Sequence, residues 1–174
     1  MAAQVVERYG GLDVMVANAG IVCVVKLTEL SAEQWDQVLN VNARGTFLCY
    51  KYAGIQMIKQ GRGGRIIGAS SLAGKQGQPS SGAYSASKFA VRGLTQSAAH
   101  EFGPHGITVN AYAPGAVDTP MKHDASQKNW VGCILSYLER LKFRAKHSIP
   151  EDISNLVSFL ASKESQFITG VFFD

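Results

Sequence analysis

The chain has 174 residues, of which 46% are hydrophobic and 17% are charged, and its formal net charge is +4. This length and composition are those of a globular protein, so we expect residues 1–174 to form a single domain. The basic residues are scattered along the chain, which argues against a nucleic-acid-binding face, and no apolar run approaches membrane-spanning length.

The cysteines limit the choice of compartment and of bound metal. Cys23, Cys49 and Cys133 are odd in number and far apart, so they match neither a disulfide framework nor a metal-ligand spacing. The first residues lack the apolar stretch of a secretory signal. We therefore expect a cytoplasmic protein with no metal site and no nucleic-acid or membrane partner.

The first predicted elements are a helix and a strand. Residues 2–9 are amphipathic and end at Gly10-Gly11, which predicts the last turns of a helix. The apolar run 12–17 predicts a fully buried parallel strand, which the turn 18–20 (Asn-Ala-Gly) closes. Ligands of an open parallel sheet bind beyond the carboxyl ends of its strands, so this turn is a candidate binding site. A simple polar turn is the alternative.

Two helices are predicted next, with an asparagine between them. Ser31 and Gln34 form a capping box for a helix that runs through residues 35–39, and a second helix is predicted for residues 43–59. Asn42 interrupts the apolar pattern between them. An asparagine inside a helical run indicates a bend or a local hydrogen bond to the backbone. A capping residue between two helices is the alternative.

The second half of the chain alternates strands and helices. The glycine-rich turn 61–64 precedes a strand instead of following one, so it is not a phosphate loop. The stripe Ala86, Ala90, Leu94 and Ala98 on the next helix indicates either core or a subunit interface. The apolar spacing of Ile153, Leu156, Val157 and Leu160 predicts a helix that faces the core and forms no site. The expected elements are strand 65–71, loop 72–82, helix 84–102, strand 107–113, the turn Pro114-Gly115, the helix around residues 150–160 and a last strand near 171–174.

Three residues of the middle segment carry possible chemistry. Tyr84 and Lys88 are four positions apart, so in a helix their side chains lie on one face, about one turn apart. A neighbouring ammonium favours phenolate and lowers the pKa of a tyrosine, which makes Tyr84 a candidate general acid or base. Ser71 ends the predicted strand thirteen residues earlier and can point into the same cleft. Solvated neighbours on a surface helix are the alternative.

The pattern Ser71–(12 residues)–Tyr84–(3 residues)–Lys88 resembles the classical short-chain dehydrogenase/reductase family. The segments 18–20 (Asn-Ala-Gly) and 41–43 (Val-Asn-Ala), and the pair Pro114-Gly115 followed by Thr119, stand in that family's order and spacing, so the resemblance covers nearly the whole chain. The segments 64–71, 84–97 and 107–115 are similar to its diacetyl/acetoin reductase (2,3-butanediol dehydrogenase) branch.

The resemblance implies a fold and a chemistry. The fold is α/β, a partial Rossmann-like doubly wound parallel sheet, and the reaction is hydride transfer between NAD or NADP and a small carbonyl or secondary alcohol such as acetoin or diacetyl. Tyr84 would exchange the hydroxyl proton, and Lys88 would lower the pKa of that tyrosine and hold the nicotinamide ribose. Ser71 would hydrogen-bond the substrate oxygen, and Asn42 would order a proton-relay water. Ser70 is an alternative to Ser71, but the spacing to Tyr84 favours Ser71.

The resemblance also implies binding positions and partners. Residues 121–147 would form a lid over the substrate, and helices at about 43–59 and 84–102 would pair subunits into a homo-dimer or homo-tetramer. The implied cofactor-binding residues are Asn18, Ala19, Gly20, Tyr84, Lys88, Pro114, Gly115, Val117 and Thr119.

The largest departure from the family lies at the front of the chain. Members open with a strand and a glycine-rich turn that receives the pyrophosphate, and a later residue chooses between NAD and NADP. Neither feature is present in this sequence. We therefore expect a sheet that lacks its first strands, an open edge at strand 12–17, and a truncated gene model or splice form. A catalytically inactive fragment, or an interaction subunit without the nucleotide-binding half, is the alternative function.

Overall fold

A parallel sheet of four strands forms the centre of the computed structural model, which describes residues 2–123 and 148–173. The strands lie in the order β1-β2-β3-β4, and each pairs in parallel with the next. The expected α/β fold is confirmed, whereas the predicted lid falls mostly on residues 124–147, outside the described ones. The strands are β1 (Val14–Ala17), β2 (Gly64–Ala69), β3 (Ile107–Tyr112) and β4 (Phe172–Phe173).

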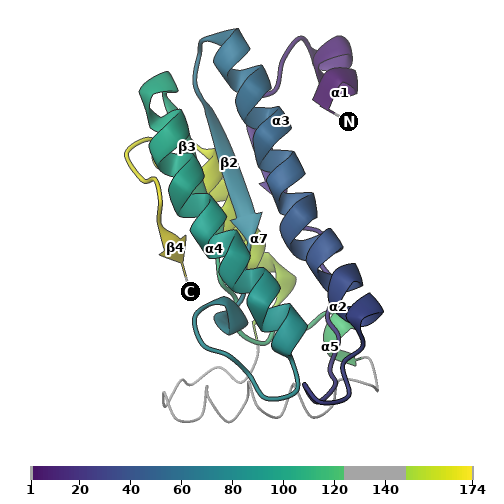
Figure 1. Ribbon diagram of the computed structural model, residues 1–174. Coiled ribbons are helices and arrows are strands. Elements are labelled where there is room, and N and C mark those ends of the chain that lie inside the picture. The colour runs from purple at the N-terminus through teal and green to yellow at the C-terminus, as the bar shows by residue number, and fades with distance from the viewer. Residues whose placement is uncertain (1, 124–147, 174) are drawn as a thin grey trace.

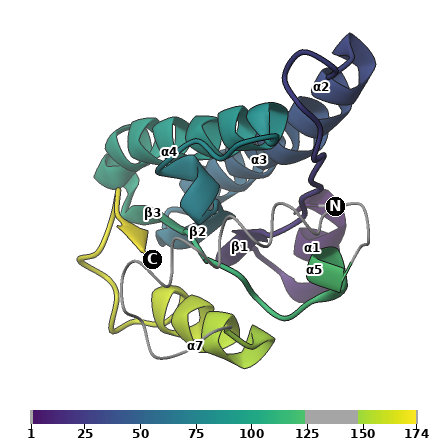
Figure 2. The ribbon, with the colours of Figure 1, turned by 90° about the horizontal axis from the view of Figure 1, so that it is seen from below.

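Helices cover both faces of the sheet. Figures 1 and 2 show α3 and α4 side by side on one face and α7 on the other. Short helical turns also occur among the described residues, at Asn40–Arg44, Leu72–Gly74 and Gly103–His105. The helices are α1 (Ala2–Tyr9), α2 (Ala32–Leu39), α3 (Gly45–Gln60), α4 (Gly82–Phe102), α5 (Pro120–His123) and α7 (Pro150–Ala161).

The strands alternate their side chains between these two faces, as the pleat requires. Ile66 and Val109 pack under α3 and α4, and both are fully buried. Ile67 and Tyr112 point the other way and pack against Leu160 of α7. The core therefore has two layers, separated by the sheet.

Close packing of α3 on the sheet depends on Gly68 of β2. A Cβ at this position would collide with the hydroxyl oxygen of Tyr50, a fully buried residue of α3. That hydroxyl lies 2.9 Å from Oγ1 of Thr95 on α4. Because Thr95 donates its own proton to the Val91 carbonyl oxygen, Tyr50 is the donor in this pair. Because Gly68 has no side chain, the Tyr50 phenol of α3 fits against β2 and also contacts Thr95 of α4.

Local signals in the sequence are reproduced at several helix ends. Ser31 and Gln34 form the predicted capping box at the start of α2. α3 ends at Gly61, whose φ of +69° is left-handed. The predicted small-residue stripe of α4 is divided, since Ala98 is buried and Ala90 is exposed.

The β1 edge differs from the interior of the sheet. The prediction of a fully buried strand is wrong, because Val14 and Val16 are each 38% exposed. Within the part of the chain that the structure describes, β1 pairs only with β2, so the open edge is confirmed. The described residues include no helix that is long and apolar enough to cross a membrane.

Candidate active site

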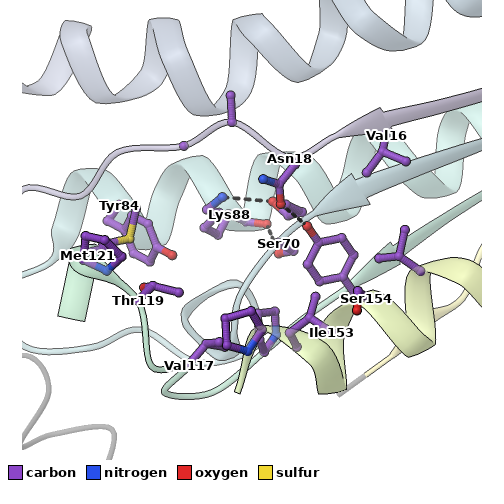
Figure 3. A pocket seen from close by; sticks show the side chains of 18 residues that line it. Val16, Asn18, Ser70, Tyr84, Lys88, Val117, Thr119, Met121, Ile153 and Ser154 are labelled. Atoms are coloured by element: carbon purple, nitrogen blue, oxygen red, sulfur yellow. Dashed lines mark hydrogen bonds between the residues drawn. The ribbon is translucent and has the colours of Figure 1, made fainter. Parts of the chain in front are cut away.

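A cavity of about 740 Å³ opens at the carboxyl ends of three neighbouring strands. Its volume lies in the range of small-molecule sites. Figure 3 shows side chains that converge on it from the ends of β1 and β2, from α4 and from α7. The lining residues are Val16, Asn18, Ala19, Gly20, Ala69, Ser70, Tyr84, Lys88, Tyr112, Pro114, Val117, Thr119, Pro120, Met121, Pro150, Ile153, Ser154 and Val157.

The first two turns of α4 place Tyr84 and Lys88 in this cavity, as their spacing predicts. Tyr84 is 5% and Lys88 is 4% exposed. The Lys88 ammonium donates to the Ala69 carbonyl oxygen at 2.9 Å, and its Nζ lies 5.5 Å from the centroid of the Tyr84 ring. The ammonium is therefore held against the end of β2, beside the phenol (Figure 3).

Burial controls the protonation of both groups. It lowers the pKa of Lys88 to about 8, because the charged form is poorly solvated. It raises the pKa of Tyr84, while the hydrogen bond with the Ser71 side chain acts in the opposite direction. The predicted lowering of the Tyr84 pKa by Lys88 is therefore not found. Desolvation dominates, and the lysine donates to a carbonyl oxygen.

The two adjacent serines have different partners. Ser71 begins the helical turn Leu72–Gly74, accepts a hydrogen bond from the Ala73 N–H at 3.1 Å and also contacts the Tyr84 hydroxyl. Ser70 lines the cavity, but its hydroxyl donates to the Lys88 carbonyl oxygen at 2.9 Å. The hydroxyl that reaches the tyrosine is thus that of Ser71, although Ser71 is not a lining residue of the cavity.

Asn42 lies in a π-helical turn behind the cavity and is fully buried. Its Oδ1 accepts from the Ile21 N–H at 2.8 Å, and its Nδ2 donates to the Ile21 carbonyl oxygen at 2.8 Å and to Ser87 Oγ at 3.0 Å. The predicted local hydrogen bond to the backbone is not found, because Ile21 lies 21 positions away; the residue instead ties the turn after β1 to α4. The water-relay role stays a prediction.

The turn after β1 approaches the lysine closely. A Cβ on Gly20 would lie 3.2 Å from Lys88 Nζ and 3.3 Å from Asn42 Oδ1, so a side chain here would crowd the ammonium. Asn18 and Ala19 line the same side of the cavity. Asn18 is exposed, and its Oδ1 accepts a hydrogen bond from the hydroxyl of Tyr112. The three predicted residues of this turn therefore line the cavity, and Gly20 also approaches Lys88 of α4.

The segment after β3 supplies the lower wall. Of its four predicted residues, Pro114, Val117 and Thr119 line the cavity and Gly115 does not. An isolated parallel bridge joins Val117 to Ser148, and the Ser148 carbonyl oxygen accepts from the Asp118 N–H at 2.9 Å. This bridge thus places the segment after β3 beside the residues that precede α7.

Sequence reasoning missed several residues of the site. The prediction that the helix around residues 150–160 forms no site is wrong, because Ile153, Ser154 and Val157 of α7 line the cavity. Helical spacing identified Ile153 and Val157 as members of an apolar stripe but assigned the whole stripe to the core, and it did not include Ser154. Tyr112 was also missed, although its place at the carboxyl end of a strand was a usable signal. Ser87 carried no signal, because its partner Asn42 is 45 positions away.

Comparison with known proteins identifies the family. The family model described as short chain dehydrogenase matches residues 1–130. The chain is 54% identical over 172 residues to a short-chain dehydrogenase/reductase of Armillaria gallica. This match covers 98% of this chain and 66% of that protein. It is 44% identical over 170 residues to L-2,3-butanediol dehydrogenase of Corynebacterium glutamicum, which covers 94% of this chain and 66% of that protein.

A solved structure agrees with these sequence matches. The crystal structure of an acetoin dehydrogenase from Salmonella typhimurium is similar with a TM-score of 0.81 and 34% identity, over 99% of this chain and 66% of that one. The chain thus spans slightly less than two thirds of the length of these relatives. The sequence match, the parallel α/β sheet and the arrangement around Tyr84 agree: this chain belongs to the short-chain dehydrogenase family.

Proposed function

We propose that the chain is the catalytic part of an NAD- or NADP-dependent oxidoreductase that transfers hydride between nicotinamide and a small carbonyl compound or secondary alcohol. The observation that carries this proposal is the position of Tyr84 and Lys88 in one cavity, with the Ser71 side chain on the tyrosine hydroxyl. Family membership supports it, since these enzymes use NAD or NADP. Because the chain spans 66% of its relatives, the activity of the whole protein is part of the proposal.

The residues of the cavity fit the nicotinamide riboside part of such a cofactor. Val117 and Ile153 offer apolar walls for a flat ring, and Thr119 offers a hydroxyl for its carboxamide. The Lys88 ammonium and the Asn18 carboxamide provide donors for ribose oxygens. The described residues include no glycine-rich turn between a strand and a helix, so the fit is limited to this half of the dinucleotide.

The protein's own side chains provide proton transfer, hydrogen bonds to the substrate and support for the cavity. When bound, the nicotinamide supplies or accepts the hydride. Tyr84 is positioned to give a proton to the substrate oxygen or to take it back, and Ser71 donates to the same oxygen as charge develops there. Lys88 places its ammonium beside the phenol, where it can hold a ribose hydroxyl of the nucleotide, whereas the pKa of Tyr84 is governed by burial. Asn42 fixes the turn 18–21 against α4 and thereby keeps both walls of the cavity in place.

We further propose a small α-hydroxyketone or diketone, such as acetoin or diacetyl, as the substrate. Apolar side chains form much of the cavity, including Val117, Met121 and Ile153. A short, uncharged molecule with two adjacent oxygens suits an apolar site that carries few hydroxyl groups. The names of the butanediol and acetoin dehydrogenase relatives support this class.

Subunit pairing through α3 and α4 is the proposed assembly, as a homo-dimer or homo-tetramer. Phe47, Tyr52 and Ile55 of α3 are 43%, 53% and 55% exposed, and Phe89 of α4 is 43% exposed. These side chains form an apolar outer surface on the two helices. Burial of such a surface between two copies would remove it from water.

Nucleotide binding is the first experiment. The folded chain is titrated with NADH, NADPH and reduced nicotinamide mononucleotide, and nucleotide fluorescence is followed. Saturable binding of the mononucleotide supports a working nicotinamide half-site, because this probe needs no adenine or pyrophosphate contacts. Tighter binding of NADH or NADPH identifies the preferred dinucleotide. Failure of a folded sample to bind any of the three contradicts the proposal.

Turnover with acetoin and diacetyl then tests the chemistry. Tyr84→Phe should lower kcat by about 10²–10⁴-fold while nucleotide affinity stays within about threefold. Lys88→Ala should weaken both binding and turnover. Tyr50→Phe is the matched control, since it removes a buried phenol hydroxyl outside the cavity. Near-normal turnover in Tyr84→Phe would overturn the assignment.

A non-catalytic interaction subunit is the second candidate. The open edge of β1, with Val14 and Val16 partly exposed, favours pairing with another chain. Size-exclusion chromatography of the nucleotide-free chain distinguishes a discrete oligomer from soluble aggregate. A discrete oligomer that binds none of the three nucleotides favours this second function.

A further inference from the structure

Tyr112 is a second tyrosine of the cavity, and the mechanism above gives it no role. It is the last residue of β3, it is 3% exposed, and it lines the cavity opposite the β1 turn. Its hydroxyl donates a hydrogen bond to Oδ1 of Asn18, at the end of β1. The two residues are 94 positions apart, so only the parallel order of the strands brings them together.

The protonation of Tyr112 makes it a permanent donor. Burial raises its pKa to about 12, and the nearby Tyr84 adds to this effect. The phenol therefore keeps its proton throughout the neutral range. Because Tyr112 is almost fully buried, its hydroxyl needs a hydrogen-bond partner within the protein. The carboxamide oxygen of Asn18 is that partner.

A carboxamide with its oxygen engaged has a defined orientation. Its oxygen accepts, whereas its nitrogen carries two donors on the opposite side. Among the residues that the structure describes, the Asn18 Nδ2 has no hydrogen-bond partner, and Asn18 is exposed at the cavity. The Tyr112 hydrogen bond thus leaves the two N–H groups of Asn18 available to a molecule in the cavity.

We propose that Tyr112 is a positioning residue that fixes the Asn18 carboxamide with its N–H donors toward the cavity, where they select a hydrogen-bond acceptor. The orientation follows from the chain's own contacts. The identity of the acceptor, an oxygen of the nicotinamide ribose, rests on the proposed function. A side chain free to rotate would present oxygen and nitrogen equally and would favour neither donors nor acceptors.

The orientation is tested in the nucleotide-free chain by NMR of side-chain amides. The ¹⁵N-labelled Asn18 amide pair is assigned by its loss in Asn18→Ala, and its heteronuclear NOE is measured. The wild-type value should be close to that of the fully bonded Asn42, and Tyr112→Phe should lower it toward that of the exposed Asn155. Tyr112→Phe keeps the ring and removes only the hydroxyl. An Asn18 amide that is equally rigid in both proteins would overturn the proposal.

Affinity for NADH supplies the second readout. Tyr112→Phe should weaken it about fivefold, which is the effect of one neutral hydrogen bond, and should add nothing in an Asn18→Ala background. Asn18→Asp keeps an acceptor for Tyr112 but loses both donors, so it should weaken binding at least as much while the melting temperature is maintained. Additive effects of Tyr112→Phe and Asn18→Ala would contradict the proposal.

Tyr50→Phe is again the matched control, because it removes a buried phenol hydroxyl that contacts Thr95 and not the cavity. It should change neither the Asn18 signal nor the affinity for NADH. If the wild-type chain binds no nucleotide, the proposed function fails, and the NMR comparison still decides whether Tyr112 orients Asn18.

Discussion

The two faces of the sheet differ in how completely their side chains are buried. Under α3 and α4, the side chains of Ile66 and Val109 are fully buried, and the polar network of Asn42 and Ser87 is hydrogen-bonded. On the opposite face, α7 covers β2 and β3, but Val16 of β1 is 38% exposed and forms one wall of the cavity. The same sheet therefore has a closed face and a partly open one.

This difference separates the face that stabilises the fold from the face that a ligand can reach. The helix that carries Tyr84 and Lys88 is fixed from the closed face, so the geometry of these groups depends on packing that no ligand supplies. On the open face, the part at β1 that α7 does not cover contributes little packing and provides the space in which a ligand can bind. We expect substitutions on the closed face to cost stability and equivalent substitutions at the β1 part of the open face to cost little.

The largest loss of stability is expected from Asn42→Ala. The change leaves the N–H and carbonyl groups of Ile21 without their side-chain partner and removes the donor to Ser87 Oγ, so the free energy of unfolding should fall by about 3 kcal/mol. Asn40→Ala is the control in the same turn, where the side chain is exposed, and it should stay within about 0.5 kcal/mol of wild type. Urea unfolding measures both; equal losses would show that the network contributes nothing.

Gly68→Ala should lower the free energy of unfolding by about 2–3 kcal/mol, because the new methyl group displaces the Tyr50 ring from its contact with Thr95. Gly93→Ala on α4, where a Cβ meets open space, should instead stabilise the chain by about 0.5–1 kcal/mol through helix propensity. Thermal and urea unfolding give both values. Addition of Tyr50→Phe should recover part of the loss, and no recovery would place the strain elsewhere.

A matched pair of valines compares the faces directly. Val109→Thr places a hydroxyl in the closed face and should cost about 2 kcal/mol of unfolding free energy. Val16→Thr makes the same change on the open face and should cost less than about 0.5 kcal/mol. Urea unfolding measures the difference between the losses of unfolding free energy in the two variants. Similar costs would mean that the β1 face is as well packed in solution as the other.

The smallest expected effect is the pH dependence that Lys88 contributes. Its folded-state pKa of about 8 lies below that of an unfolded lysine, so above pH 8 the unfolded chain binds more protons and stability rises with pH. Between about pH 7 and about pH 9, wild type should gain about 1 kcal/mol relative to Lys88→Met, in which this group is absent. Comparison of the two proteins cancels the other titrating groups. A constant difference across this range would contradict the depressed pKa.

Local sequence patterns predicted much of the site because they act over short distances. Tyr84 and Lys88 share one helix face through their spacing, and Ser71 lies two positions after the end of β2, a strand that its apolar run identifies. The turn 18–20 was found because it follows a strand at the edge where ligands of parallel sheets bind. Each of these inferences needs only a helical or strand period and the direction of one element.

The missed contacts depend on segments that are distant in the chain. Tyr112 meets Asn18 only because β1 and β3 both pair with β2, and Ser87 meets Asn42 only because α4 packs against the π-helical turn. The pKa of Tyr84 was predicted in the wrong direction for the same reason. Spacing placed a cation nearby, but burial of the phenol by other elements has the larger effect.

The sequence by itself determined the α/β class, the family, the helix that carries Tyr84 and Lys88, and the open edge at β1. Period, spacing and capping are local properties, so a linear reading can find them. The spacing to Tyr84 also favoured Ser71 over Ser70. Only the tertiary structure decided which residues of α7 line the cavity and which side chain Tyr112 contacts. Those outcomes depend on burial and on contacts between strands and helices, and they exist only once the sheet has brought its strand ends together.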